Sequence, residues 1–299
     1  MSSYLELTAR QRIPAIFDAG SFEEFLPPSA RVVSPHLAQL DAPVSFDDGV
    51  VVGRGLLDGH VVFGAAQEGG FMGGAVGEVH GAKLVGMLRR AVDEQAHAVL
   101  LLLESGGVRL HEANAGLIAV SEVMRAMLDA RAADIPVVAL VGGANGCFGG
   151  MGISARCANT VIMSEEGRLA MSGPEVIETA SGVEEFDSRD RALVWRTTGG
   201  KHRYLLGDCQ VLVPDDTAAF RAAAVQAIAD IRAGSASLTL EGLLDEQAML
   251  ARRLEDTAGL HDPVDVWRQL GVPDPGAVPM LEADAFMQLA APYRAGGQR

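Results

Sequence analysis

Several residue types that mark particular protein classes are scarce in this chain. Only three of its 299 residues are cysteine, and Cys147, Cys157 and Cys209 have no CxxC spacing. This odd, scattered set argues against a disulfide framework and against a zinc ribbon, and favours a reducing compartment. Aromatic residues make up only 5% of the chain. The core is therefore expected to consist mainly of small aliphatic side chains.

Basic residues are outnumbered by acidic ones, and long apolar runs are missing. Lys and Arg number 24 against 39 Asp and Glu, which gives a net charge of −15. Nucleic acids and membrane surfaces are anionic, so neither is expected as a partner. Neither the opening "MSSYLELTARQRIPAIF" nor any later segment contains the run of about 18 apolar residues that a membrane span needs. We therefore expect a soluble, cytoplasmic protein.

The residues that are abundant indicate an α/β protein. Hydrophobic residues make up 48% of the chain, which also holds 35 glycines, and this combination suits tight loops and close backbone approach. Segments 50–57 and 60–67 flank Asp58-Gly59. This is a strong hairpin signal, because glycine accepts the positive φ of a type I′ turn. Further strands are expected at 135–141 and 159–164.

Beyond the hairpin one unit recurs, which consists of an apolar strand, a glycine pair and an amphipathic helix. The pairs come at nearly equal spacing and are Gly69-Gly70, Gly106-Gly107 and Gly142-Gly143. Residue identities do not repeat, so only the architecture does. After the second pair, helical spacing predicts a buried stripe of Leu117, Val120, Met124, Met127 and Leu128.

The chain is predicted to divide after residue 233. Residues 1–233 form the main domain, which opens with a helical lead-in over 1–45. In that lead-in Ser21 and Glu24 have the spacing of a capping box. The sequence "GSAS" from 234 is typical of a linker. Residues 234–299 are expected to form an accessory segment of helical and irregular chain, and not a second catalytic domain.

Two later helices are predicted within the main domain. The first covers 174–195 and begins at Pro174, where the missing N–H costs nothing. The second covers 215–233 and has Asp215 and Asp216 at its N-terminus, where negative charge is favourable.

The glycine pair within "LLLLESGGVRLHEANAG" (100–116) has two interpretations. The first is a tight turn between a buried strand and a helix, since glycines serve turns and helix packing. The second is chemical, because bare N–H groups at a helix N-terminus can bind a developing oxyanion. That effect is worth roughly 3–4 kcal/mol per donor in acyl-transfer enzymes. The pair alone does not decide between the two.

Other kinds of site fit the sequence poorly. The segment "GGFMGGAVGEVHGAK" lacks the G-K-S/T of a P-loop and does not match a Rossmann fingerprint. Ser105 and Ser164 lie in no GxSxG elbow. No metal site is expected either, because His80, His97 and His111 lack metal-ligand spacing.

Four segments occur in a fixed order over roughly residues 8–215, namely "ARQRIPAIFDAGSFEEF", "GGFMGGAVGEVHGAKL", "ESGGVRLHEA" and "EEGRLAMSGPEVIE". They resemble the ARERI…LxDxGSFxE, GGSMG-x-x-x-G-x-K/R, SGGARMQE and AEPxAxIGFAGPRVIE segments of carboxyltransferase β subunits of acyl-CoA carboxylases. Unlike the bacterial acetyl-CoA carboxylase β subunit, this chain has no four-cysteine ribbon. The segments "WRTTGGKHRYLLGDCQVLVPDD" and "GGANGCFGGMGISARCANT" resemble instead the β subunits of biotin-independent malonate decarboxylases.

The resemblance implies a crotonase (ClpP-like) fold, a superhelix of ββα units with peripheral helices. It implies that a γ subunit completes the active site, and that an acyl carrier protein and an acyl carrier protein transferase subunit also take part. The substrate would be a malonyl thioester on the phosphoribosyl-dephospho-CoA prosthetic group of the carrier. The reaction would release CO2 without biotin or metal and would serve malonate catabolism.

The same resemblance implies site residues. Loss of CO2 leaves an enolate, whose oxygen fixed N–H donors would stabilise selectively. The matching positions are Gly106 and Gly107, with Gly149 and Gly150 in a second glycine-rich segment. His111 replaces a family Gln and is a candidate proton donor. The alternative is that it caps the following helix.

Further positions are candidates for binding the substrate and its prosthetic group. In the first glycine segment they are Gly69, Gly70, Gly73 and Gly74. The most basic local cluster could bind phosphates or an acidic carrier, and consists of Arg196, Lys201, His202 and Arg203. A solvated loop with local ion pairs is the alternative for this cluster.

Three other functions stay open at this point. The chain could be the carboxyltransferase β subunit of a biotin-dependent acyl-CoA carboxylase. It could also be a non-catalytic scaffold subunit that offers only a binding surface. A peptidase on the same fold is the weakest, since no Ser paired with His or Lys can be identified.

Overall fold

The hairpin predicted at Asp58-Gly59 is confirmed in the computed structural model, which describes residues 2–39, 46–234 and 239–294. Strands β2 (Val50–Leu57) and β3 (His60–Gln67) pair antiparallel along their whole length. Both turn residues have positive φ, 52° at Asp58 and 78° at Gly59, as a type I′ turn requires.

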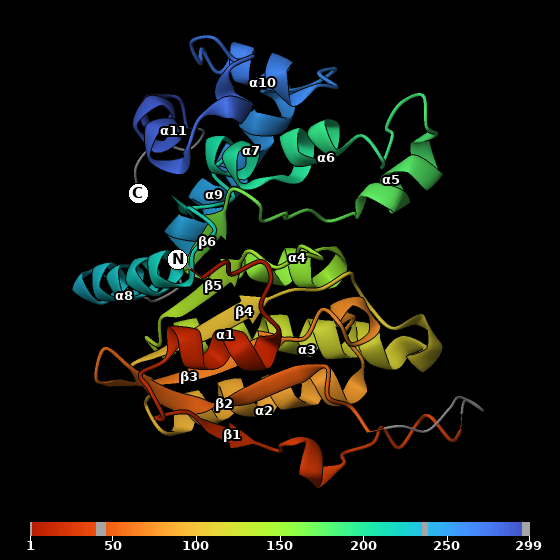
Figure 1. Cartoon of the computed structure of the whole chain (residues 1–299), viewed down its shortest axis with the longest axis vertical. Coiled ribbons are helices and arrows are strands. Elements are labelled where there is room, and N and C mark those ends of the chain that lie inside the picture. The colour runs from red at the N-terminus through yellow and green to blue at the C-terminus, as the bar shows by residue number, and fades with distance from the viewer. Residues whose placement is uncertain (1, 40–45, 235–238, 295–299) are drawn as a thin grey trace.

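The described strands form one seven-stranded sheet whose spatial order follows the chain, from β1 to β7 (Figure 1). β1, β2 and β3 pair antiparallel, and from β3 onward every pair is parallel. The strands expected at 135–141 and 159–164 are confirmed as β5 and β6. The other strands besides the hairpin are β1 (Glu23–Phe25), β4 (Ala98–Leu103), β5 (Val137–Val141), β6 (Thr160–Ser164) and β7 (Val211–Val213).

Helices cover both faces of the sheet. In β4, Leu100 and Leu102 pack with α1 and α8, whereas Leu101 and Leu103 pack with α2 and α3. The apolar run is continuous because a parallel strand between two helical layers is buried on both faces. The helices are α1 (Ala9–Ile16), α2 (Glu78–Asp93), α3 (Asn114–Ala132), α4 (Gly149–Ala155), α5 (Pro174–Ser181), α6 (Arg191–Thr198), α7 (Gly200–Leu205), α8 (Thr217–Ala233), α9 (Leu240–Asp256), α10 (Pro263–Gln269) and α11 (Ala283–Ala290).

The predicted repeat appears as a strand, a short bridge and a helix. Beyond the carboxyl ends of the main strands, Val76 bridges Val108, Ser105 bridges Cys147, and Cys147 bridges Leu169, all in parallel. Helices α2, α3, α4 and α5 follow these bridges in turn. Each unit is therefore ββα, with the second strand reduced to a bridge, as predicted.

The helical lead-in predicted for 1–45 is only partly right. Helix α1 forms, but the capping box at Ser21 and Glu24 is wrong, because the chain there becomes strand β1 and pairs with β2. The hydroxyl of Ser21 instead donates to the Asp18 carbonyl at 2.7 Å. Gly53 of β2 permits this close pairing, since a Cβ there would lie 2.3 Å from the Glu23 carbonyl oxygen. Residues 40–45 of the lead-in lie outside the described residues.

Two other sequence predictions need correction. The helix expected over 174–195 is split into α5 and α6, because Gly182 ends α5 with a φ of 91°. The buried stripe on α3 is right for Val120 and Met127 but wrong for Leu117, which is 59% exposed. The prediction that Pro174 lies in the first turn of a helix is confirmed by α5. So is the N-terminal acid of α8, where Asp216 accepts a hydrogen bond from the Ala219 N–H.

The segment after α8 packs on the main domain. Trp267 and Phe286 belong to the same apolar cluster as Leu212 of β7 and the α2–α3 layer. Of the predicted linker, residues 235–237 lie outside the described residues, and the boundary at 233 stays a prediction. Among the helices that the structure describes, none has the length and apolar character needed to cross a membrane.

Candidate functional site

The glycine turns that follow β3, β4 and β5 meet at one edge of the molecule. The N–H of Gly106 donates to the Gly73 carbonyl at 2.7 Å, which joins the first two turns. A Cβ placed on Gly149 would lie 2.9 Å from the Cα of Gly107, which brings in the third. Parallel strands bring their carboxyl ends to one edge, and the bridges between the ββα units hold the turns in contact.

Three of the four glycines proposed as oxyanion donors have N–H groups that are hydrogen-bonded in the structure, and the catalytic role of all four stays a prediction. Gly106 N–H is bonded to Gly73, Gly107 N–H to the Ser105 hydroxyl at 3.2 Å, and Gly149 N–H to the Met171 carbonyl at 2.9 Å. Gly150, in the first turn of α4, has an N–H without an acceptor among the described residues. Contacts with other segments, which the sequence does not reveal, use the N–H groups of Gly106 and Gly149, whereas Gly107 bonds within its own turn.

Val108 supplies a second open donor that the sequence interpretation missed. Val76 N–H donates to the Gly107 carbonyl, and Arg109 N–H donates to the Val76 carbonyl at 3.0 Å. In a parallel ladder the residue between these two points its own N–H away from that neighbour. The N–H of Val108 accordingly has no acceptor within the described part of the chain. It is directed away from Val76, toward the side on which Ser105 of the same segment bridges Cys147.

Glu104 lies under the turns and explains several of their glycines. This carboxylate is only 4% exposed, forms an ion pair with buried Arg12 and accepts from the Asn145 N–H at 3.0 Å. A Cβ on Gly69 would lie 2.4 Å from its Oε1, and a Cβ on Gly74 would lie 2.0 Å from its carbonyl oxygen. Packing against Glu104 therefore accounts for these two glycines, which the sequence interpretation assigned to substrate binding.

The other two glycines of this turn, Gly70 and Gly73, make different contacts. Gly70 N–H donates to the Glu68 carboxylate at 2.9 Å. Gly73 has a φ of 63° and space where a side chain would be, and its carbonyl is the acceptor for Gly106. Their predicted contact with substrate stays a prediction.

Arg109 and Glu112 hold the second turn in place. Arg109 pairs with Asp47 and, at 3.0 Å, with Glu112, and all three side chains are buried. Glu112 also accepts from the Glu78 N–H at 2.6 Å, at the start of α2. These residues therefore support the turn from inside, and their side chains also line a small pocket beside it.

His111 is the titratable side chain of this turn that remains accessible. Its side chain is 42% exposed, and its Nε2 lies 3.8 Å from Glu112 Oε1. It borders a small pocket together with Phe71 and Met72. The residue before α3 is Ala113, which has no side-chain cap. His111 does not cap α3, which removes the structural role that the sequence left open.

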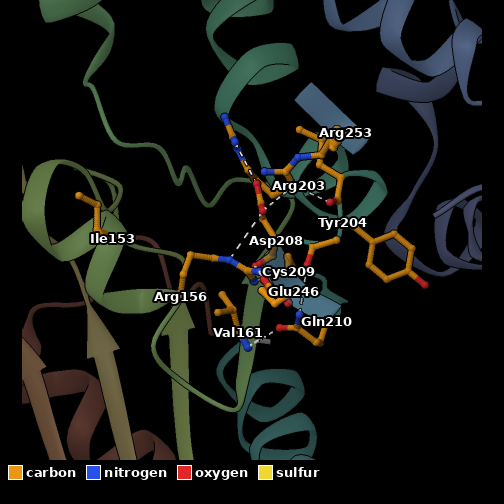
Figure 2. A network of polar contacts seen from close by, with 12 residues as sticks. Ile153, Arg156, Val161, Arg203, Tyr204, Asp208, Cys209, Gln210, Glu246 and Arg253 are labelled. Carbon is orange, nitrogen blue, oxygen red and sulfur yellow. Dashed lines mark hydrogen bonds and ion pairs between the residues drawn. The ribbon is translucent and has the colours of Figure 1, made fainter. Parts of the chain in front are cut away.

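The predicted basic cluster is not a free cationic surface. Arg196 pairs with Asp262 at 3.1 Å, Lys201 with Glu165 at 2.8 Å, and Arg203 with Asp208 at 3.1 Å. His202 is buried and accepts from Trp267 Nε1 at 3.0 Å. Figure 2 shows Arg203 directed at Asp208 beside Arg156 and Arg253. The cations of this cluster therefore have internal partners, two of them from the C-terminal segment, and its assignment to phosphates or an acidic carrier stays a prediction.

Charge reversal at Lys201 should loosen the C-terminal segment. Lys201 also donates to the carbonyls of Pro279 and Leu281, so Lys201→Glu removes both contacts and places two carboxylates together at Glu165. We expect faster cleavage between α10 and α11 in limited proteolysis. Arg89→Glu, at an exposed arginine, serves as control, and equal cleavage rates for the two variants would contradict the assignment.

His202 should make the protein less stable in mild acid. Burial, helped by neighbouring Arg203, lowers the pKa of His202 to about 3, so the folded protein holds it neutral while the unfolded chain binds a proton below about 6.5. Stability is thus complete above that pH and falls as the pH drops toward 3, by about 1.4 kcal/mol per pH unit. Burial also lowers the pKa of His80 to about 3, so His80 should add a similar loss of stability in acid. The free energy of unfolding, measured by urea denaturation between pH 7.5 and 5, should depend less steeply on pH for His202→Gln than for the wild type.

Apolar side chains are exposed around the glycine turns. They come from the turns themselves, from the start of α3 and from the segment leading into α5, and they are Met72, Leu110, Leu117, Ile118, Met171 and Val176. Leu110 is 91% exposed and Met171 69%. A concentration of this kind next to polar backbone donors is typical of a surface that another protein covers.

Comparisons with known proteins show the family of this chain. The family model described as "Carboxyl transferase domain" matches residues 5–226. The chain belongs to the carboxyl transferase domain family. It is 39% identical to a malonyl-S-ACP:biotin-protein carboxyltransferase from Malonomonas rubra, over 98% of this chain and 97% of that one.

Structural and more distant relatives place the chain within this family. A Pseudomonas malonate decarboxylase hetero-tetramer contains a chain that is 42% identical, with a TM-score of 0.80, over 90% of this chain and 97% of that one. The propionyl-CoA carboxylase β chain of Saccharopolyspora erythraea is 32% identical, but the match covers 67% of this chain and only 36% of that protein.

For this carboxyl transferase family member, the α/β fold of crotonase type is confirmed. The chain is an enzyme of the carboxyltransferase and malonate decarboxylase type. Its structural neighbour is a hetero-oligomeric complex, which supports a partner subunit. The sequence resemblance therefore led to the right family.

Proposed function

We propose that this chain is the β subunit of a malonate decarboxylase and acts on a malonyl thioester carried by an acyl carrier protein. The observation that carries the proposal is the pair of open N–H donors, at Val108 and Gly150, where the glycine turns meet. The similarity to a malonate decarboxylase chain supports it. The product would be the acetyl thioester, and the pathway malonate catabolism.

The donors suit the charge that this reaction develops. When the bond to the carboxylate breaks, CO2 leaves and the electron pair stays on the α-carbon as an enolate, whose charge lies on the thioester oxygen. Donors fixed before the reaction bind that oxygen more strongly in the transition state than in the ground state. A proton then adds to the α-carbon. In this proposal the carboxyl group is released and is not passed to biotin.

His111 is the proposed source of that proton, directly or through one water. It lies four residues after Gly107, is partly exposed and is next to the Glu112 carboxylate. His111→Gln should lower kcat for CO2 release by about 100-fold and change its pH profile, whereas exposed His261→Gln should do neither. Near-normal turnover by His111→Gln would remove this residue from the mechanism.

The exposed apolar side chains around the turns are the proposed contact surface for the γ subunit. That subunit would cover the site and exclude water from it. An acyl carrier protein and its transferase subunit would act with this pair. The phosphates of a phosphoribosyl-dephospho-CoA carrier group would have to compete with the ion pairs of the basic cluster first suggested for them.

A carboxyltransferase function is the second candidate, favoured by the similarity to the Malonomonas rubra protein over nearly the whole chain. The enolate and its donors would be the same, but the carboxyl group would pass to biotin. Release of CO2 from malonyl-carrier protein by this chain and its co-purified partner tests the proposal. We expect this chain and its partner to release CO2 without a biotin carrier. Transfer of the carboxyl group to a biotin carrier, with no release of CO2 in its absence, would favour the second candidate.

A further inference from the structure

Helix α9 presents a row of leucines to solvent. They lie on one side of the helix, at a spacing of three, four and seven residues. They are Leu240, Leu243, Leu244, Leu250 and Leu254, which are 73, 52, 55, 39 and 75% exposed. Gln247 and Ala251 lie between them and are exposed as well. We name these seven residues the α9 stripe.

The α9 stripe is not the face by which α9 joins its own domain. Met249 is buried, Arg253 donates to Asp208 at 2.9 Å, and Glu246 accepts from Arg156 at 2.8 Å (Figure 2). The side of the helix that makes these contacts is different from the side that carries the leucines. The domain therefore fixes α9 in place, so that an association through the stripe costs little additional ordering entropy.

The stripe has the pattern of a coiled-coil seam and is symmetric. Residues 240, 243, 247, 250 and 254 take the a and d positions of successive heptads. The apolar residues repeat in both directions from Gln247. At three, four and seven residues before it are Leu244, Leu243 and Leu240, and at the same distances after it are Leu250, Ala251 and Leu254.

We propose that the α9 stripe binds the α9 stripe of a second copy of this chain, as an antiparallel helix pair around a two-fold axis at Gln247. A two-fold interface requires a patch that is complementary to itself, and the symmetry of the stripe about one residue provides this. Leu240 of one copy packs beside Leu254 of the other, and Leu244 beside Leu250.

Gln247 sets the register of the pair. On the axis, the two Gln247 amides meet and can hydrogen-bond to each other. In a pair shifted along the seam, each amide would be buried against leucine without a partner, which is costly. A single polar residue at an a position commonly selects one arrangement in this way.

The proposed pair leaves the glycine turns open. The stripe's helix is attached to Arg156, which follows the C-terminal end of α4, whereas the turns gather at the N-terminal end of that helix. The inference does not depend on the proposed reaction. A helix pair of this length is smaller than a permanent interface, so the association should be reversible and concentration-dependent.

Sedimentation of the full chain, alone and with its co-purified partner subunit, tests the proposal. Over ~1–200 μM chain the wild type should shift from one copy to two, and Leu243→Glu/Leu250→Glu should stay at one copy throughout. Ala248→Glu changes an exposed residue outside the stripe on the same helix and should dimerise like the wild type. Because the substituted leucines are exposed, circular dichroism should be unchanged in all variants.

Disulfide trapping tests the antiparallel geometry, in a Cys157→Ser background because Cys157 is partly exposed. Gln247→Cys should cross-link with itself under mild oxidation. Leu240→Cys alone should not, because its two copies would lie about 20 Å apart. A mixture of Leu240→Cys and Leu254→Cys chains should cross-link.

Three results would overturn the proposal. The first is a wild type that stays at one copy over the whole concentration range. The second is a Leu240→Cys variant that cross-links with itself, as a parallel pair would. The third is a Leu243→Glu/Leu250→Glu variant that loses a different subunit while the copy number of this chain is unchanged. In the last case the stripe would belong to that subunit.

Discussion

Gly107→Ala should lower kcat for CO2 release from a malonyl thioester by about 100-fold or more. Gly107 has a φ of 134°, which an alanine rarely adopts, and its Cα lies against Gly149 at the start of α4. To relieve the strain the turn must rotate, and the N–H of neighbouring Val108 moves with it. Steady-state kinetics of the complex with its partner subunit measure the effect.

Gly59→Ala is the matched control for this variant. Gly59 also has a positive φ, 78°, and open space where a Cβ would lie, but it is in the β2–β3 hairpin away from the turns. Both variants should lose about 1–3 kcal/mol of stability from backbone strain, and only Gly107→Ala should lose turnover. Normal turnover by Gly107→Ala would instead favour the scaffold role that the sequence left open.

Glu104→Ala should give the largest loss of stability. The substitution leaves the guanidinium of Arg12, itself 1% exposed, buried without its charge partner, and it also removes the acceptor for Asn145 N–H. Breaking a buried pair on one side costs about 3–5 kcal/mol. For a chain of this size this corresponds to a fall in Tm of roughly 6–15 °C, which differential scanning calorimetry would detect.

An exposed ion pair provides the comparison for Glu104. Glu122 pairs with Arg125 on the surface of α3, where both side chains are about half exposed. Glu122→Ala should leave the Tm unchanged, because solvent screens such pairs. A Tm of Glu104→Ala equal to that of the wild type would mean that the buried pair does not hold the turns together.

Local signals in the sequence predicted most of the fold. The Asp58-Gly59 turn, the apolar run before Glu104 and the helix starts at Pro174 and Asp216 each depend on residues close together in the chain, and each was right. The capping box predicted at Ser21 and Glu24 was wrong because pairing with β2, a strand some thirty residues away, overrode a weak local preference.

The details of the site could not be derived in the same way. Glycine pairs predict turns with free N–H groups, but whether a donor stays free depends on which other turn packs against it. Gly73, 33 residues before Gly106, takes its N–H, and only the bridges between units reveal this. The contacts of Arg196 and Lys201 could not be derived for the same reason, since their partners Asp262 and Pro279 come from the C-terminal segment.

The most direct test of the central claim is CO2 release from malonyl-carrier protein by the chain and its partner subunit, measured with and without excess avidin. CO2 should be released at the same rate in both conditions, without any biotinylated protein. A rate that avidin abolishes, or that appears only when a biotin carrier is added, would contradict the claim and would identify the chain as a carboxyltransferase subunit.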